Sequence, residues 1–176
     1  MPELPEVETI TSNLKRGTAG APSLIGQTIL GAHILWQKTL AEPDPETFQA
    51  ILQGQTIQNI GRRAKYITIN LTESILVIHL RMSGDLRVEP TQSPLNKHDR
   101  LTLDFDSGWR LSFNDTRKFG RVWLVRDTQN LFSSLGPEPD DPALTPERFH
   151  EMLKTRSRAI KPLLLDQHFL AGLGNI

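Results

Sequence analysis

The chain begins MPELPEVET, and its second and third residues carry groups that can act together in catalysis. If Met1 is removed, which the small residue after it favours, Pro2 becomes a secondary amine at the end of the chain. An α-amino group has a pKa of about 8, so more of it is neutral at pH 7 than of a lysine amine. A neutral secondary amine can attack a sugar C1′ and form a Schiff base. Glu3 can then donate a proton to the sugar oxygen or to the departing base.

The same residues also fit the simple start of a helix. Pro5 suits the first helical turn, where its missing N–H is not needed. Residues at helical spacing follow it, namely Val7, Ile10, Thr11 and Leu14. From these residues alone, both interpretations of the N-terminus stay open.

The length and composition limit the class of protein. A chain of 176 residues can form one domain with a core, or one domain plus the start of a second. It contains no cysteine, which excludes a disulfide framework and a thiolate metal site in these residues, and its five histidines show no ligand spacing. The sequence shows neither a basic-then-apolar leader nor an apolar run of the roughly 20 residues that a membrane span needs. We expect a soluble, cytoplasmic protein without a targeting signal or a bound metal.

Charge is balanced overall but unevenly distributed. Twenty basic and twenty acidic residues give a formal net charge of zero, which argues against binding of polyanions by bulk charge alone. Residues 61–126 nevertheless carry twelve basic and seven acidic residues, and residues 148–176 carry five and two, whereas residues 127–147 carry none and five. Two basic blocks separated by an acidic one are expected where one face of a protein meets an anion.

Short apolar or alternating runs predict antiparallel strands of a sandwich or barrel. The runs are 24–36, 66–71, 75–80, 101–105, 109–113 and 121–125, with turn signals at Ser83-Gly84 and Ser107-Gly108. Between the first two runs, residues 45–53 predict a helix with Phe48, Ile51 and Leu52 on one face.

From residue 135 onward, the composition of the sequence changes. Residues 135–147 hold four prolines and four acids, which is typical of a linker. Thr145 followed by Pro146 predicts the N-terminus of a helix, and residues 159–167 predict a second one. Gly172 and Gly174 then predict a turn of the kind that introduces another helix, so we expect a domain that is cut off part way.

Several motifs in a fixed order resemble the formamidopyrimidine-DNA glycosylases, bacterial base-excision repair enzymes that remove oxidised purines such as 8-oxoguanine. The start PELPEVET resembles theirs, and Leu4 and Val7 fit this branch better than its endonuclease VIII-like relatives. The resemblance implies an α+β fold, with an N-terminal helix and an antiparallel two-sheet β-sandwich over residues 1–134. A linker over 135–147 and the first part of a helix–two-turn–helix DNA-binding domain over 148–176 would follow.

The resemblance assigns catalytic roles to three residues. Pro2 would be the nucleophile that displaces the base, and Glu3 would handle protons. The motif GRRAKY at 61–66 resembles the loop of the catalytic lysine, so Lys65 would be a general acid/base that also contacts phosphate. The alternative is a solvated basic turn before a strand.

Two loops resemble the parts of the family that enter the DNA base stack. IHLRMSGDL at 78–86 would place Met82 in the gap left by a flipped nucleotide, although a methionine at a hairpin turn also serves in packing. Arg81 departs from the glycine expected there. NDTRKFGR at 114–121 would let Arg117 bond the unpaired opposite base and Phe119 stack beside it, the alternative being an ordinary hairpin turn.

Four further residues resemble DNA-backbone contacts. KHDR at 97–100 places His98 at a phosphate-binding position, although a lone histidine among charges is usually a surface residue. Arg156 and Lys161 would touch backbone phosphate. Asn175, in the motif GLGNI, would lie in a turn whose amides bind a phosphate.

The resemblance therefore implies a bifunctional DNA glycosylase and abasic-site lyase that acts on damaged double-stranded DNA, as a monomer and without a membrane. No cofactor is expected within this chain; full-length members carry a structural zinc in a four-cysteine hairpin, which these residues lack. One alternative is an inactive or weakly DNA-binding truncated fragment of the same family. Another is a tautomerase, which also uses an N-terminal proline, as a general base, but whose chains are shorter and need no basic loops.

Overall fold

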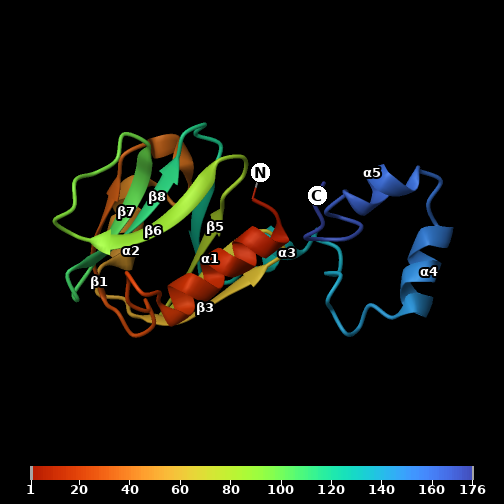
Figure 1. Cartoon of the computed structure of the whole chain (residues 1–176), viewed down its shortest axis with the longest axis horizontal. Coiled ribbons are helices and arrows are strands. Elements are labelled where there is room, and N and C mark those ends of the chain that lie inside the picture. The colour runs from red at the N-terminus through yellow and green to blue at the C-terminus, as the bar shows by residue number, and fades with distance from the viewer. Residues whose placement is uncertain (1, 176) are drawn as a thin grey trace.

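The chain folds into a β-sandwich and a smaller helical lobe that lie side by side (Figure 1). The structure is a computed structural model that describes residues 2–175. The two chain ends lie next to each other where the sandwich meets the lobe, and the backbone amide of Asn175 donates to Glu3 Oε1 at 2.7 Å. The predicted α+β architecture is confirmed, and the site is built at this junction.

Helix α1, Leu4–Arg16, begins as the sequence predicts. Pro5 lies in its first turn, and the amide of Glu3 donates to Glu6 Oε2 at 2.9 Å as part of a capping box. The helix packs against strand β3 (Ile57–Arg63) of the sandwich. Its buried residues are Val7, Thr11 and Leu14.

Two sheets form the sandwich. Within the described residues, the first sheet has the order β1 (Ile29–Ile34), β7 (Asp99–Phe105), β8 (Trp109–Asp115) and β6 (Gly84–Pro90). The second has the order β2 (Leu40–Glu42), β9 (Arg121–Val125), β5 (Ile75–His79), β4 (Tyr66–Leu71) and β3. Neighbouring strands are antiparallel except β2 and β9, which run parallel, so the expectation of a wholly antiparallel sandwich is wrong at that edge.

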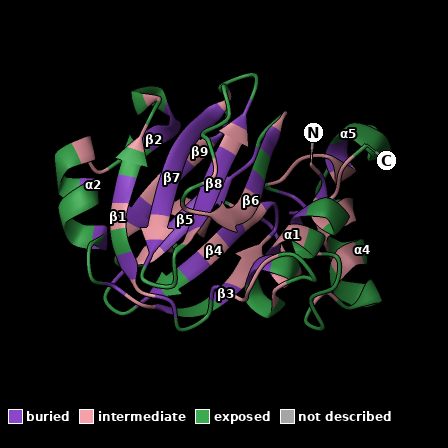
Figure 2. Cartoon of the chain, turned by 60° about the vertical axis from the view of Figure 1, so that its left-hand side comes forward, coloured by how far each residue is buried: buried purple, intermediate pink, exposed green. Residues whose placement is uncertain are grey.

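The core lies between the two sheets, where Figure 2 shows buried segments on most strands. Its largest fully buried side chains include Phe48, Phe105 and Phe113. Phe48 comes from helix α2, Pro45–Leu52, which begins at Asp44 because the Asp44 carboxylate accepts the Thr47 amide at 3.0 Å. Ile51, which the sequence groups on one face with Phe48 and Leu52, is 42 % exposed, whereas those two are fully buried.

The sequence predicted the apolar strands and missed the polar ones. Residues 24–36 form a strand only as β1, because Leu24 is buried in a turn that Gly26 (φ 81°) continues. Strands β3 and β6 were not predicted, since their polar residues obscure any alternation. They exist because they pair with β4 and β8. Two short helices were also missed, a 3₁₀ turn at Gln37–Thr39 and α3 at Gln129–Phe132.

The helical lobe has its own apolar cluster. Helix α4, Pro146–Lys154, begins at Thr145, whose hydroxyl accepts the amide of Arg148 at 3.2 Å, as predicted. Helix α5 covers only Ile160–Leu164 rather than 159–167. It is shorter because the backbone carbonyl of Asp166 starts a new turn by accepting the amides of Phe169 and Leu170. Buried Leu163, Phe169 and Leu170 hold the lobe together. The residue limits of the predicted domains stay predictions.

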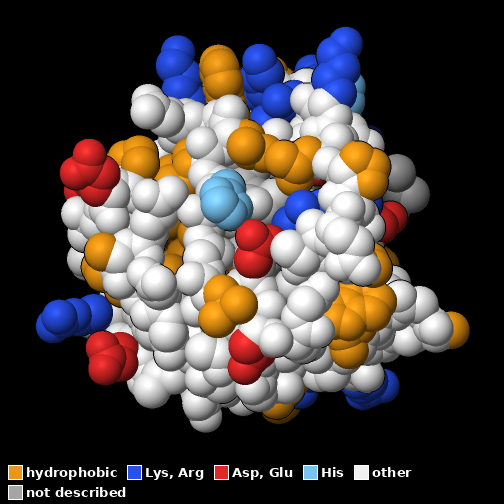
Figure 3. All heavy atoms as spheres, turned by 90° about the vertical axis from the view of Figure 1, so that its left-hand side faces the viewer, with side chains coloured by type: hydrophobic (Ala, Val, Ile, Leu, Met, Phe, Trp, Pro, Cys, Tyr) orange, Lys and Arg blue, Asp and Glu red, His pale blue; other side chains and the backbone are white. Residues whose placement is uncertain are grey.

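Charge is not spread evenly over the surface. Figure 3 shows Lys and Arg side chains along the upper edge of the molecule, and Figure 1 places the β8–β9 turn at that edge. The rest of the face in Figure 3 carries scattered acidic, hydrophobic and a few basic side chains. Among the described residues, no helix is long and apolar enough to cross a membrane.

Asp115, at the end of β8, ties the β5–β6 turn to the β8–β9 turn. Its fully buried carboxylate accepts the Ser83 hydroxyl at 2.5 Å, the Gly120 amide at 2.7 Å and the Arg117 amide at 3.1 Å. Burial alone raises the pKa of Asp115, but hydrogen bonds from Ser83 and from the amides of Gly120, Arg117 and Phe119 outweigh it. The pKa of Asp115 therefore lies below its usual value, and the carboxylate holds both turns in place.

We expect Asp115→Ala to lower the free energy of unfolding strongly. The change leaves the Ser83 hydroxyl and the Gly120 amide without their buried acceptor, at about 1–3 kcal/mol each, whereas the Arg117 amide keeps Ser83 Oγ as an acceptor. Urea denaturation measures the loss. Asp85→Ala removes an exposed acid from the neighbouring strand β6 and is the matched control, with an expected change within about 0.5 kcal/mol. Equal midpoints for the two variants would contradict the bracing role of Asp115.

Candidate functional site

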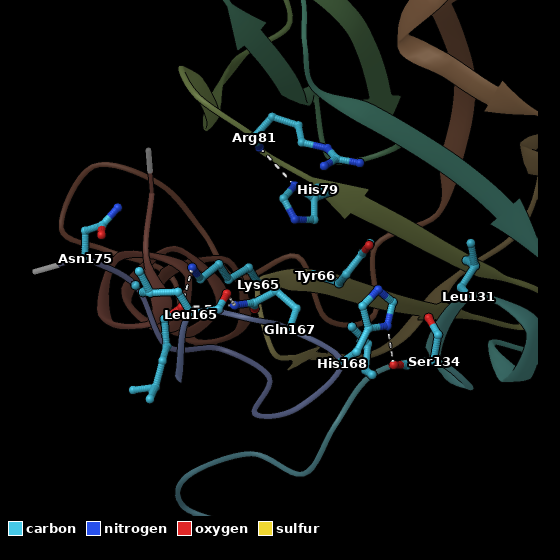
Figure 4. A pocket seen from close by; sticks show the side chains of 13 residues that line it. Lys65, Tyr66, His79, Arg81, Leu131, Ser134, Leu165, Gln167, His168 and Asn175 are labelled. Atoms are coloured by element: carbon cyan, nitrogen blue, oxygen red, sulfur yellow. Dashed lines mark hydrogen bonds between the residues drawn. The ribbon is translucent and has the colours of Figure 1, made fainter. Parts of the chain in front are cut away.

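A cavity of about 360 Å³ opens at the junction of the sandwich and the helical lobe (Figure 4). The sandwich contributes the start of β4 and the end of β5, and the lobe contributes the chain that follows α5. The lining residues are Lys65, Tyr66, His79, Arg81, Leu131, Ser134, Leu135, Leu165, Gln167, His168, Leu173, Gly174 and Asn175. Lys65 and Asn175, two of the predicted site residues, thus lie in one cavity although they are far apart in sequence.

Lys65 lies in the turn between β3 and β4 and is only 6 % exposed. Its Nζ donates to the backbone carbonyl of Leu173 at 2.8 Å. Burial lowers the pKa of Lys65, and the nearby carboxylate of Glu3 partly opposes this. The interpretation of Lys65 as part of a solvated turn is therefore wrong. Its amine is closer to neutrality at a given pH than that of an ordinary lysine, as a group that exchanges protons needs to be.

Glu3 is 8 % exposed and faces the last described residues. Besides the bond from Asn175, its carboxylate lies so close to Gly174 that a Cβ there would be 2.0 Å from Glu3 Cδ. Only glycine lets the chain pass at this point. Half-exposed Pro2 directly precedes Glu3. Met1, whose removal would free the Pro2 amine, lies outside the described residues.

The turn that meets Glu3 and Lys65 is fixed by Gln167, which the sequence did not single out. Gln167 Oε1 accepts the Gly172 amide at 2.9 Å, and its Nε2 donates to the Leu173 carbonyl at 3.1 Å. The Leu173 carbonyl therefore serves Lys65 and Gln167 together. A side-chain amide shortly before a glycine-rich turn is the signal that could have indicated this role.

His79, at the end of β5, is a second cavity residue that the sequence analysis missed. It is 9 % exposed, and its Nδ1 accepts the Arg81 amide at 3.0 Å, which assigns the ring proton to Nε2 (Figure 4). Burial lowers the pKa of His79 to about 4, and the charges of Arg81 and Lys65 add to this. The ring is neutral at pH 7. A histidine ending the apolar run ILVIHL is the signal that could have found it.

The predicted stack-insertion residues lie together on the exposed rim. Met82 is 41 % and Phe119 is 50 % exposed, and both line a hollow of about 370 Å³ with Arg81 and Arg121. The guanidinium of Arg117 lies 5.2 Å from the centre of the Phe119 ring. Met82 is therefore not a core residue. Arg81, where a glycine was expected, has φ 56°, a left-handed conformation that explains why glycine would be favoured there.

The other predicted DNA contacts lie outside the cavity. His98 is half-buried beside β7, and its Nδ1 lies 3.2 Å from Arg100 Nη2. Arg156 follows α4 and Lys161 lies in α5, both exposed. The structure therefore brings together Glu3, Lys65 and Asn175, with Pro2 directly before Glu3 in the chain. It places Met82, Arg117 and Phe119 on the rim and leaves His98, Arg156 and Lys161 on the outer surface.

Two family models match the chain. The formamidopyrimidine-DNA glycosylase N-terminal domain matches residues 1–122, and the formamidopyrimidine-DNA glycosylase H2TH domain matches residues 135–176. The first match alone covers more than half of the chain and contains Pro2, Glu3 and Lys65. The second contains Asn175.

Curated relatives match over the whole chain. The chain is 47 % identical to the formamidopyrimidine-DNA glycosylase of Protochlamydia amoebophila and 48 % identical to that of Chloroflexus aurantiacus. All of this chain is covered in both comparisons. It spans 62 % of the length of each of these two relatives.

Solved structures show the same fold. The Lactococcus lactis formamidopyrimidine-DNA glycosylase, non-covalently bound to DNA containing an abasic site, matches with a TM-score of 0.89 at 36 % identity. The match covers 99 % of this chain and 66 % of that one. A MutM structure in complex with DNA containing carbocyclic 8-oxoguanine gives the same TM-score and identity over 65 % of its chain. Motifs, fold and relatives agree, and the chain belongs to the formamidopyrimidine-DNA glycosylase family.

Proposed function

We propose that the chain is the catalytic part of a DNA glycosylase and abasic-site lyase that removes oxidised purines, such as 8-oxoguanine and formamidopyrimidines, from double-stranded DNA. The observation that carries the proposal is the buried pair of Lys65 and Glu3 next to Pro2, at a cavity with exposed Met82 and Phe119 on the nearby rim. We propose that it acts as a monomer in the cytoplasm, where bacterial DNA lies.

Pro2 supplies the nucleophile in this mechanism. With Met1 removed, the lone pair of the Pro2 nitrogen attacks C1′, and the bond between C1′ and the base breaks with its electrons passing to the base. The nitrogen then loses its N–H proton, which balances the proton that the departing base takes up. A proton from Glu3 to the sugar ring oxygen opens the ring and leaves an iminium ion on Pro2. Loss of a C2′ proton then expels the 3′ phosphate and cuts the strand, and water releases Pro2.

In the proposed mechanism, Lys65 handles protons in these steps. Because burial lowers the pKa of Lys65, a larger fraction of its amine is free to accept a proton than in a solvated lysine. The carbonyl of Leu173 holds the nitrogen at one point in the cavity wall. Neutral His79 adds no positive charge beside it.

The rim residues account for access to the base. A nucleophile cannot reach C1′ inside an intact stack, so the damaged nucleotide leaves it, at a cost of a few kcal/mol. Met82 and Phe119 fill the gap, and Arg117 bonds the base left unpaired. His98, Arg156, Lys161 and Asn175 contact backbone phosphates, which position the duplex without reading its sequence. The basic edge in Figure 3 fits this orientation.

In this proposal, these residues do not hold the structural zinc of the family. The chain has no cysteine, and residues 2–175 contain no group of three or more His, Asp or Glu side chains that could hold a metal ion. No step proposed above passes through a metal.

A second candidate function is weak DNA binding without turnover. It is favoured by the formal net charge of zero, which gives the chain no bulk attraction to a polyanion. Binding that rests on phosphate contacts weakens as salt rises. Binding to an 8-oxoguanine duplex without a covalent adduct, at low salt and with Met1 shown by mass spectrometry to be absent, would favour this function.

We expect borohydride to trap a covalent adduct between the chain and an 8-oxoguanine duplex at low salt. Pro2→Gly should slow trapping even at saturating protein, because it replaces the cyclic secondary amine. Arg117→Ala should cost about 1–3 kcal/mol of binding, which more protein overcomes. Denaturing gels measure the adduct against protein concentration. Abolished trapping in Arg117→Ala, with Pro2→Gly unaffected, would show that Pro2 is not the nucleophile.

We expect the free energy of unfolding to fall as the pH falls from 6.5 to about 4. In this window the unfolded chain binds a proton on His79 and the folded chain does not, so acid favours unfolding by about 3 kcal/mol. Urea denaturation across the window measures the slope. His79→Gln should flatten it, whereas His33→Gln, at an exposed position of β1, should not. An unchanged slope in His79→Gln would contradict a neutral buried His79.

A further inference from the structure

Residues 135–141, here called the strap, are docked on both parts of the molecule although their composition is that of a linker. On the lobe side, the Gly136 amide donates to the Gln167 carbonyl and the Ala171 amide donates to the Pro137 carbonyl, both at 2.9 Å. On the sandwich side, Arg63 Nη2 donates to the Gly136 carbonyl at 2.7 Å. The strap is therefore fixed in place between the two parts.

Glu138, in the middle of the strap, is the centre of these contacts. Its side chain is 13 % exposed. Oε1 accepts Arg63 Nη1 at 2.7 Å and the backbone amide of Ala64 at 3.0 Å, and Oε2 accepts Arg62 Nη1. Burial lowers the pKa of Arg62, but the hydrogen bonds that Arg62 donates to Glu8 and Glu138 outweigh this, so the pKa of Arg62 lies above its usual value.

The contact with Ala64 links the strap to the cavity. Ala64 is 1 % exposed and has φ 51°, a left-handed conformation that residues with a Cβ adopt only when their surroundings enforce it. This conformation turns the next residue, Lys65, away from the line of β3 and into the cavity. The Glu138 carboxylate holds the Ala64 amide, and through it the turn.

The strap also fixes the acceptor of the Lys65 amine. The bond from the Ala171 amide to the Pro137 carbonyl lies two residues before Leu173, whose carbonyl accepts Lys65 Nζ. The strap therefore holds two things in place. One is the backbone just before Lys65, through the Ala64 amide, and the other is the segment with the Leu173 carbonyl, which accepts the Lys65 amine.

We propose that Glu138 is a positioning residue for Lys65, acting through the Ala64 amide rather than on the substrate. The proposal rests on the proposed function of Lys65 as the group that exchanges protons. Misplacing a catalytic group by about 1 Å can slow a reaction about 100-fold. Glu138 lies outside the cavity lining, so its effect on the reaction would pass through the position of Lys65 rather than through contact with the substrate.

The test compares Glu138→Ala with two control variants, each of which removes another acidic partner of Arg62. Asp140→Asn and Glu8→Gln each remove one carboxylate bonded to Arg62, at 3.1 and 2.6 Å, and neither acid bonds to Ala64. Glu138→Gln keeps an oxygen that can accept the Ala64 amide. All four variants first need a cooperative urea transition, which shows that they fold.

The first readout is the state of the Lys65 amine, which does not depend on activity. Acetic anhydride labels neutral amines, and mass spectrometry of Lys65 acetylation against pH gives the midpoint. The titratable or charged groups around the amine are Glu3 at the N-cap of α1, and the cavity residues Tyr66, His79, Arg81 and His168. In Glu138→Ala we expect the midpoint to rise toward that of a solvated lysine, whereas Asp140→Asn and Glu8→Gln keep the midpoint of the unaltered chain.

The second readout is borohydride trapping on the 8-oxoguanine duplex. Glu138→Ala should lower the trapping rate by about 10- to 100-fold, and Glu138→Gln by less. The two controls should stay within about twofold of the unaltered chain. A folded Glu138→Ala variant with unchanged midpoint and trapping, or a loss of the same size in Asp140→Asn, would overturn the proposal.

Two further outcomes are informative. If Glu138→Ala does not fold, hydrogen exchange of the Ala64 amide in the unaltered chain decides: protection supports its bond to Glu138, and rapid exchange overturns it. If the unaltered chain forms no adduct, the proposed function fails. The labelling midpoint then still shows whether Glu138 sets the state of Lys65.

Discussion

The site depends on one buried amine, that of Lys65 in the sandwich, whose hydrogen-bond acceptor belongs to the helical lobe. A buried ammonium is costly unless it is paired, and the Lys65 amine is given one carbonyl, that of Leu173, and one nearby carboxylate, that of Glu3. Burial lowers the pKa of Lys65, and the Glu3 carboxylate offsets this only in part. Because the carbonyl comes from the helical lobe, the sandwich alone does not build the site.

This constraint explains the close approach of the two chain ends. The segment that brings the Leu173 carbonyl to Lys65 must pass over the start of α1. At Gly174 there is no room for a Cβ against Glu3, and at Gly172 (φ 103°) a Cβ would lie 2.5 Å from Leu4 Cδ1. The glycines of the GLGN turn are therefore needed where backbone meets the N-terminus, and Gln167 holds the turn between them. The N-terminal proline alone was also compatible with a tautomerase. Membership of the formamidopyrimidine-DNA glycosylase family contradicts that interpretation.

The sequence predicted what local pattern determines and missed what long-range contact determines. Apolar runs predicted β4, β5, β7, β8 and β9, and Thr145-Pro146 predicted the start of α4. Strand β3 was missed because its strand character comes from pairing with β4. Lys65 and Met82 were found only through a resemblance, since a lysine or methionine in a turn carries no local signal of function. His79 and Glu138 were missed because their partners become neighbours only in the fold.

The missed residues share one physical task, which is to hold strained turns. Within residues 2–175, the non-glycine residues with positive φ are Ala64, Arg81 and Lys118, and each directly precedes a predicted site residue, namely Lys65, Met82 or Phe119. Each strained turn has a nearby acceptor: Glu138 takes the Ala64 amide, His79 takes the Arg81 amide, and Asp115 takes the amides on either side of Lys118–Phe119. Strain of this kind persists only where the surroundings enforce it. Here it occurs in turns where the next side chain has to project in one direction. The acceptors are therefore as much a part of the site as the residues they hold, although they touch no substrate.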